Sequence, residues 1–271
     1  MAWSLLGTQF CLQLAFGVLL SMAFVPKAPV GALFYRVMGT TALVPVMMAL
    51  AALVGMEQRG WGDPLVLACL AALVAYPFYS GPVRGARWGM ALGVGALGTA
   101  TAVFLAVREG LNLGLDSGAG ESVGTGLLSL ATASALATGA VAGSVGLAMV
   151  LGHWYLTVPN LSIKHLLRLN KVTAATMVAS LLLLVTSCLM HGADLMDSNG
   201  RELLGPTGLF YLGTRITVGL VLPLIFAAMT AGSLKFKNTR SATGILYAST
   251  VLVLIGTALS VSLQDAFGVP L

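Results

Sequence analysis

Charge is the first property that this sequence lacks. Asp, Glu, Lys and Arg make up 8% of its 271 residues, whereas a typical soluble domain carries about 25%. Hydrophobic residues account for 58% of the chain, so a water-soluble fold of this length would leave most of its surface uncharged. The composition therefore predicts an integral membrane protein with the lipid bilayer as its solvent. Nucleic acid is excluded as a partner, because no basic patch accompanies a soluble fold.

Metal-ligating and redox-active side chains are also scarce. The chain has three cysteines, three histidines and no Cys-x-x-Cys pair. Structural zinc and cysteine-ligated iron–sulfur centres need more Cys or His side chains, so we expect no metal site. A two-haem cytochrome b would need four axial histidines. A single haem b is disfavoured too, because His153 and His165 come from one loop whereas His191 falls on the opposite side of the expected membrane.

Long apolar runs are abundant by contrast. Lipid offers the backbone no hydrogen-bond partners, so such runs cross a bilayer as helices of about 20 residues. We expect an all-α integral membrane protein with eight transmembrane helices. The expected spans are Trp3–Val25, Tyr35–Gly55, Pro64–Ser80, Trp88–Val107, Gly126–Gly152, Lys171–Met190, Thr207–Ser233 and Ala242–Gln264.

The loops between these spans separate the charges by sign. One set of loops holds ten basic residues and no acid, and the other set holds all nine acids with three basic residues. Loops rich in Lys and Arg remain in the cytoplasm. The sequence therefore predicts a multi-pass protein of a bacterial-type inner membrane with both termini on the non-cytoplasmic side. The ten basic residues are Lys27, Arg36, Arg84, Arg87, Lys164, Arg168, Lys171, Lys235, Lys237 and Arg240.

The chain also shows signs of an internal duplication. A Val-Pro pair followed by a basic residue occurs after the first span, at positions 25–36, and again after the fifth, at 158–168. One polytopic domain, residues 1–271, would then consist of parallel four-helix halves, 1–125 and 126–271. The alternative is that loops of membrane proteins carry Pro and basic residues for topological reasons alone.

Small residues are concentrated in the fourth and fifth spans. Gly139 and Gly143 have the G-x-x-x-G spacing that allows two helix backbones to approach closely in lipid. Tight helix packing is the simpler interpretation of these residues. The functional alternative is a groove shaped for a flat cofactor such as a haem or a quinone ring.

The loop after the fifth span carries the most distinctive polar residues. Pro159 ends the fifth helix, and the pattern of residues 160–168 predicts a short amphipathic helix in the cytoplasmic interface. Imidazole and phenol groups can hydrogen-bond a quinone carbonyl and exchange its proton. Anchoring in the interface is the alternative role for the same residues. The cytoplasmic-side candidates for a quinone site are His153, Tyr155, His165, Tyr35 and Arg36.

Arg215 is the one basic residue well inside an expected span and not at its end, roughly 12 Å from the outer end at about 1.5 Å per residue. Charged groups within spans usually face the bundle interior, where they pair or serve function. We consider three roles: pairing with Asp194, snorkelling towards the outer head groups, or contact with a substrate or quinone. Arg215, His191 and Asp194 form the outer-side candidate site.

With few buried charges and small loops, the chain is predicted to be a subunit of a larger assembly. Eight spans in two four-helix halves are similar in outline to the quinone-interacting anchor subunits of membrane-bound molybdenum and iron–sulfur oxidoreductases, and the resemblance is one of topology only. It implies a membrane-anchor subunit of a respiratory or related electron-transfer complex, with quinone as its small-molecule partner and other membrane or peripheral subunits around it. The alternatives are a small-solute transporter or permease subunit, and a structural scaffold.

Overall fold

The computed structural model describes residues 2–25, 30–55, 61–80, 86–108, 121–158, 161–190, 203 and 205–267. Within these residues nearly all of the backbone is helical and none of it forms a strand. The helical elements are α1 (Ala2–Met22), α3 (Ala32–Val54), α4 (Pro64–Ser80), α5 (Ala86–Arg108), α6 (Glu121–Thr157), α7 (Lys164–Met190), α8 (Pro206–Ile216), the π-helical turn η1 (Thr217–Val221), α9 (Leu222–Lys235) and α10 (Thr239–Phe267).

Length and apolar character support a multi-pass membrane protein. Seven helices are long and apolar enough to cross a membrane, with α8, η1 and α9 counted as one continuous helix. The remaining helix, α4, is shorter, and its apolar part covers only Pro64–Phe78, which is less than the roughly 20 residues that a span needs. The described chain thus provides seven helices of spanning length where the sequence predicts eight spans.

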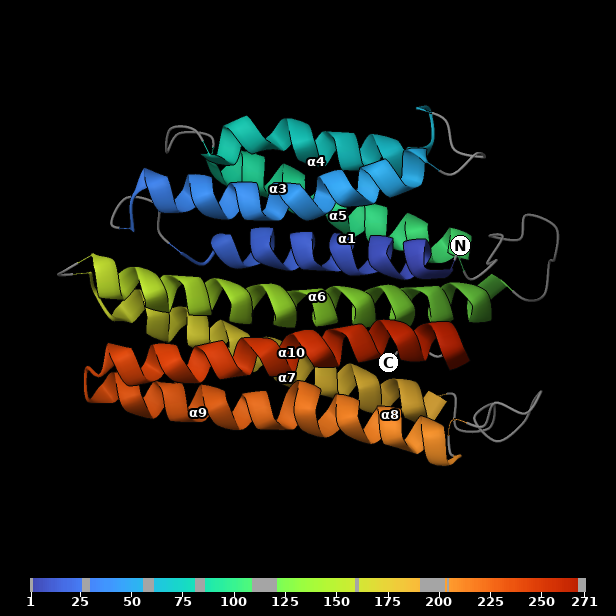
Figure 1. Cartoon of the computed structure of the whole chain (residues 1–271). Helices are drawn as coiled ribbons and strands as arrows, with labels where there is room; N and C mark the ends of the chain where they lie inside the picture. Colours follow the sequence, from blue (N-terminus) through green and yellow to red (C-terminus); the bar gives the residue numbers. More distant parts are fainter. Residues whose placement is uncertain are drawn as a thin grey trace.

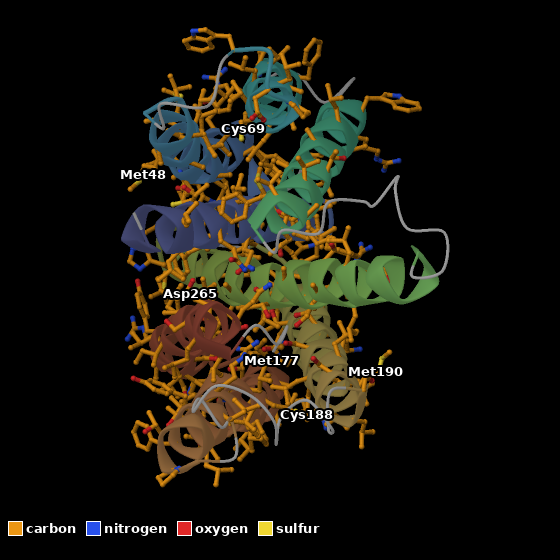
Figure 2. The ribbon with its side chains drawn as sticks, turned by 90° about the vertical axis from the view of Figure 1, so that its right-hand side faces the viewer. Met48, Cys69, Met177, Cys188, Met190 and Asp265 are labelled. Carbon is orange, nitrogen blue, oxygen red and sulfur yellow. The ribbon has the colours of Figure 1, made fainter. Side chains whose placement is uncertain are left out.

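The helices form one elongated bundle with α1 and α6 at its centre. The other helices of the N-terminal part, α3, α4 and α5, lie on one side of this central pair, and α7 to α10 lie on the other side (Figures 1 and 2). Met177 of α7 is buried within the second group, whereas Met190 at the end of the same helix is exposed (Figure 2). The helix order therefore separates the chain into two groups that meet mainly through α1 and α6.

The two ends of the bundle differ in charge. The C-terminal ends of α1, α4, α6 and α9 lie at one end of the bundle, and the start of α1 and the end of α10 lie at the other (Figure 1). Except for Arg108 at the end of α5, the described basic residues near the ends of the bundle gather at the first end, which we call the basic end. The opposite end carries the described acids Asp63, Glu121 and Asp265. The helix arrangement thus preserves the separation of charge that the sequence predicts.

Glycines bring the two central helices into backbone contact. A Cβ atom at Gly17 of α1 would overlap the carbonyl oxygen of Gly139 of α6, and one at Gly143 would overlap the backbone of Gly17. A Cβ atom at Gly139 would likewise meet the backbone of Gln13. Only glycine permits an approach this close. The prediction that Gly139 and Gly143 serve tight helix packing is therefore confirmed.

The start of α7 corrects one prediction. The expected amphipathic helix in the membrane interface is instead the first part of α7, which begins at Lys164 and continues without interruption to Met190. Neither Pro nor Gly occurs between these two residues, so nothing ends the helix after its first turns. Leu166 and Leu169 are both fully buried in the main core of the bundle. The basic residues of this segment thus lie on the first turns of a long helix.

The penultimate span is not a uniform α-helix. Its turn η1 is wider than an α-helical turn, and the N–H group of Leu222 donates to the carbonyl oxygen of Thr217. Pro223 follows directly and has no N–H group to continue the regular hydrogen-bond ladder. Single π-helical turns within α-helices frequently mark functional positions. This one begins two residues after Arg215.

Candidate functional site

Arg215 lies in the interior of the second helix group. It is the largest fully buried side chain described, with no solvent-exposed surface. Its Nη2 atom donates to the Oγ1 atom of Thr138 in α6 at 3.0 Å and to the Oγ atom of Ser180 in α7 at 3.1 Å. The guanidinium group of α8 is thus held between two neighbouring helices by neutral hydroxyl groups.

Two glycines form a further wall beside the guanidinium group. A Cβ atom at Gly219 of η1 would lie 2.8 Å from the Cα atom of Gly256 in α10, and a Cβ atom at either glycine would lie 3.3 Å from Nη1 of Arg215. Any larger residue at these positions would push α10 and η1 apart or displace the guanidinium group. We call the surroundings of this group, formed by Thr138, Ser180, Gly219 and Gly256, the Arg215 chamber.

The chamber leaves part of the guanidinium group without a partner. Nε and Nη1 of Arg215 have no hydrogen-bond acceptor among the described residues, and no described carboxylate forms an ion pair with it. An isolated buried charge is costly in free energy unless it is paired. The side chain therefore combines a positive charge with three unused N–H donors, one on Nε and two on Nη1.

These contacts decide between some of the predicted roles of Arg215. Snorkelling towards the outer head groups is wrong, because the guanidinium group is fully buried and hydrogen-bonded to Thr138 of α6. The proposed pair with Asp194 and the contribution of His191 fall outside the described residues. Contact with a ligand remains a prediction.

A polar stripe runs along the buried face of α7 on both sides of Ser180. The amide nitrogen of Asn170 donates to the carbonyl oxygen of Ala227 in α9 at 2.8 Å, and this bond ties the two helices together near the basic end. Spacings of three and seven residues, about one and two helical turns, place the members of the stripe on one face of the helix. They are Asn170, Thr173, Ser180 and Ser187, all buried.

The cytoplasmic-side candidates are distributed among several contacts. Tyr35 is buried, and its hydroxyl group donates to the carbonyl oxygens of Val25 and Met22 at the end of α1. Tyr155 donates its hydroxyl group to the carbonyl oxygen of Ser162. Both phenol groups therefore hold chain connections in place.

Trp154, which lies between His153 and Tyr155 in the sequence, contacts α3 and the segment just before it. Trp154 donates its indole N–H group to the carbonyl oxygen of Val30 at 3.3 Å, and its ring packs edge-on against Phe34 of α3 at 5.7 Å. Arg36 is exposed and His165 is half-buried, and neither has a described side-chain hydrogen bond with the other candidates. The structure thus does not join the five candidates in one polar cluster.

His153 instead meets a residue that the sequence did not single out. Its Nδ1 atom lies 3.3 Å from the hydroxyl oxygen of Tyr247 in α10, and both side chains are exposed on the surface of the bundle. Their helices approach closely here, since a Cβ atom at Gly152 would lie 2.9 Å from the Oγ1 atom of Thr243. A titratable imidazole and a phenol thus form an accessible pair near the basic end.

Sequence reasoning missed most partners of the two sites. The sequence signals Thr138 and Ser180 only as hydroxyl-bearing residues within apolar runs. It signals Gly219 and Gly256 only as small residues in two different spans.

Among the described residues, no group of three or more His, Cys, Asp or Glu side chains is placed to hold a metal ion. No protein-family model, curated protein or solved structure matches this chain.

Proposed function

We propose that this protein is a membrane-anchor subunit of a respiratory or related electron-transfer complex, and that it binds quinone or quinol at His153 and Tyr247. In this proposal α4 completes a set of eight membrane segments, arranged as two parallel four-helix halves. The basic end faces the cytoplasm, as loops rich in Lys and Arg do, so both termini lie outside.

The exposed pair of His153 and Tyr247 carries this proposal. Nδ1 of His153 lies within hydrogen-bond distance of the Tyr247 hydroxyl group, so either side chain can reach a carbonyl oxygen of a quinone ring from the lipid phase. An imidazole ring can accept or supply the proton that a quinol exchanges. The position at the bundle surface, with Tyr247 45% exposed, gives a lipid-dissolved ring direct access.

Mild-detergent purification from native membranes tests the assembly part of the proposal. We expect partner subunits with haem or flavin absorbance to co-purify with this chain.

Quinol turnover tests the site. The turnover of the intact assembly, measured with a short-chain quinol, is expected to fall at least tenfold in His153→Ala and severalfold in Tyr247→Phe. Tyr211→Phe is the matched control, because Tyr211 is also partly exposed but lies on α8, near the opposite end. Unchanged turnover in both His153→Ala and Tyr247→Phe would remove the site assignment.

A second candidate function is small-solute transport, and the polar stripe of α7 favours it. From Asn170 to Ser187 the stripe extends about 25 Å along the helix at 1.5 Å per residue, close to the thickness of a bilayer core. Transport pathways are built from polar groups that face the interior of a bundle. Solute flux into liposomes that contain this chain alone would support the transporter over the anchor subunit.

A further inference from the structure

We propose that the Arg215 chamber binds a small monovalent anion, either a halide such as chloride or the carboxylate of a very small acid. This proposal is independent of the quinone site, because the chamber is fully enclosed and His153 is exposed on the surface. The anion would neutralise a buried positive charge for which the described residues supply no acid.

The hydroxyl groups of the chamber can each donate one hydrogen bond. Serine and threonine hydroxyls in helices commonly donate to the carbonyl oxygen one turn earlier, as Thr101 does to Leu97 and Thr257 does to Val253. Thr138 and Ser180 have no such acceptor among the described residues, and their oxygens accept from Arg215 instead. Their hydroxyl hydrogens therefore remain available in the chamber.

The chamber thus presents donors and positive charge together. The guanidinium group supplies three unused N–H groups on Nε and Nη1, and the two hydroxyl groups supply one hydrogen each. Hydrogen bonds between such donors and an anion are strengthened by the charges on both partners and by the low dielectric of a buried site. A neutral ligand would leave the positive charge uncompensated.

The walls restrict the size of the anion. Gly219 and Gly256 lie against Nη1, and a single added Cβ atom would already come within 3.3 Å of it. The side chain has no exposed surface, so an occupant must fit within the closed helix packing. Such a site would admit only a very small anion such as chloride or formate and would exclude the much larger gluconate, and this difference in size provides a control at equal ionic strength.

The test is the thermal unfolding of purified full-length protein in detergent. Sodium chloride or sodium formate replaces sodium gluconate at constant total salt. We expect the unfolding midpoint to rise saturably with chloride, with formate or with both, and the ion that acts identifies the ligand. A wild-type midpoint that is the same in all three salts would overturn the proposal.

Variants assign the effect to the chamber. Arg215→Gln is expected to abolish the dependence on the anion, and Thr138→Val is expected to weaken the apparent affinity roughly tenfold because one charge-assisted hydrogen bond is lost. Thr173→Val is the matched control, since Thr173 is also buried with an unpaired hydroxyl group but does not contact Arg215. An equal anion response in wild type and Arg215→Gln would show binding elsewhere and contradict the assignment.

A further variant separates an anion from a protein carboxylate. Pairing with Asp194, which lies outside the described residues, is one of the three roles that the sequence suggests for Arg215. If the chamber holds an external anion, Asp194→Asn retains the wild-type anion response. If the response appears only after Asp194→Asn, the carboxylate occupies the chamber in the wild type and the proposal is wrong. If one of these variants fails to fold, wild-type crystals grown with bromide give the same decision. The anomalous scattering of bromide shows whether the ion is bound beside Arg215 or absent there.

Discussion

The Cα atom of Gly17 in α1 lies so close to the carbonyl group of Gly139 in α6 that Gly17 has no space for a side chain, and Gly139 has none because it faces the backbone of Gln13. This contact lies where the two helix groups of the bundle meet (Figure 1). Because lipid supplies no hydrophobic driving force between helices, close van der Waals packing of this kind stabilises their association. The contact of Gly17 with Gly139 therefore holds the two groups together.

Gly139→Ala is expected to destabilise the protein by about 1–3 kcal/mol, the usual cost of overpacking. The added methyl group would collide with the backbone of Gln13 and force α1 and α6 apart. The measurement is unfolding by a denaturing detergent, followed by circular dichroism. Gly95→Ala is the control, because a Cβ atom there meets nothing within 4 Å, and its effect is expected to stay within about 0.5 kcal/mol. Equal stability of the two variants would contradict the proposal that the close contact at Gly139 stabilises the packing of α1 against α6.

The sequence was sufficient to predict the helical class and the approximate positions of the seven helices of spanning length and of the shorter α4. Apolar length and the charge of loops are local properties, and both can be read along the chain. The start of α7 at Lys164 was missed because the basic residues of its first turns suggested a separate surface helix. The turn η1 was missed because a π-helical turn has no reliable local signal, although Pro223 indicates where the regular ladder is interrupted.

The sites were less predictable, because they depend on which helices are neighbours. The position of Arg215 inside a span could be read from the sequence, but Thr138 is 77 positions away and Ser180 is 35 away. Similarly, Tyr247 lies 94 positions from His153. No local pattern connects such pairs, so only the helix arrangement reveals them.

A buried pair of amide side chains connects α1 directly with α10. Nε2 of Gln9 donates to Oε1 of Gln264 at 2.7 Å, and this bond joins the first and last helices of the chain. A double-mutant cycle with Gln9→Leu and Gln264→Leu is expected to give a coupling free energy of about 0.6 kcal/mol and no more than about 1.7 kcal/mol, as for other hydrogen bonds between membrane helices. Additive effects of the two substitutions in the same unfolding assay would show that the bond contributes no stability.

Arg215→Met is expected to leave stability unchanged or to raise it by up to about 4 kcal/mol in gluconate buffer. Methionine retains an unbranched chain of similar shape, and it removes a buried charge with unpaired donors; replacing buried ionic groups by apolar ones is often neutral or stabilising. The measurement is the free energy of unfolding in detergent without a small anion. A loss of several kcal/mol would instead identify Arg215 as a structural residue whose removal breaks a charge pair.

Opposite ends of the bundle are expected to face different compartments. Phe236 lies at the basic end and is 86% exposed, and Trp61 lies at the other end and is 66% exposed. In a variant with Cys11, Cys69 and Cys188 replaced by Ala, we expect Trp61→Cys to react with a membrane-impermeant maleimide in intact spheroplasts. Phe236→Cys is expected to react only after the membrane is opened, because Lys and Arg hold the neighbouring loops in the cytoplasm. Reaction of both cysteines in intact spheroplasts would contradict the proposed topology, and the reverse pattern would invert its orientation.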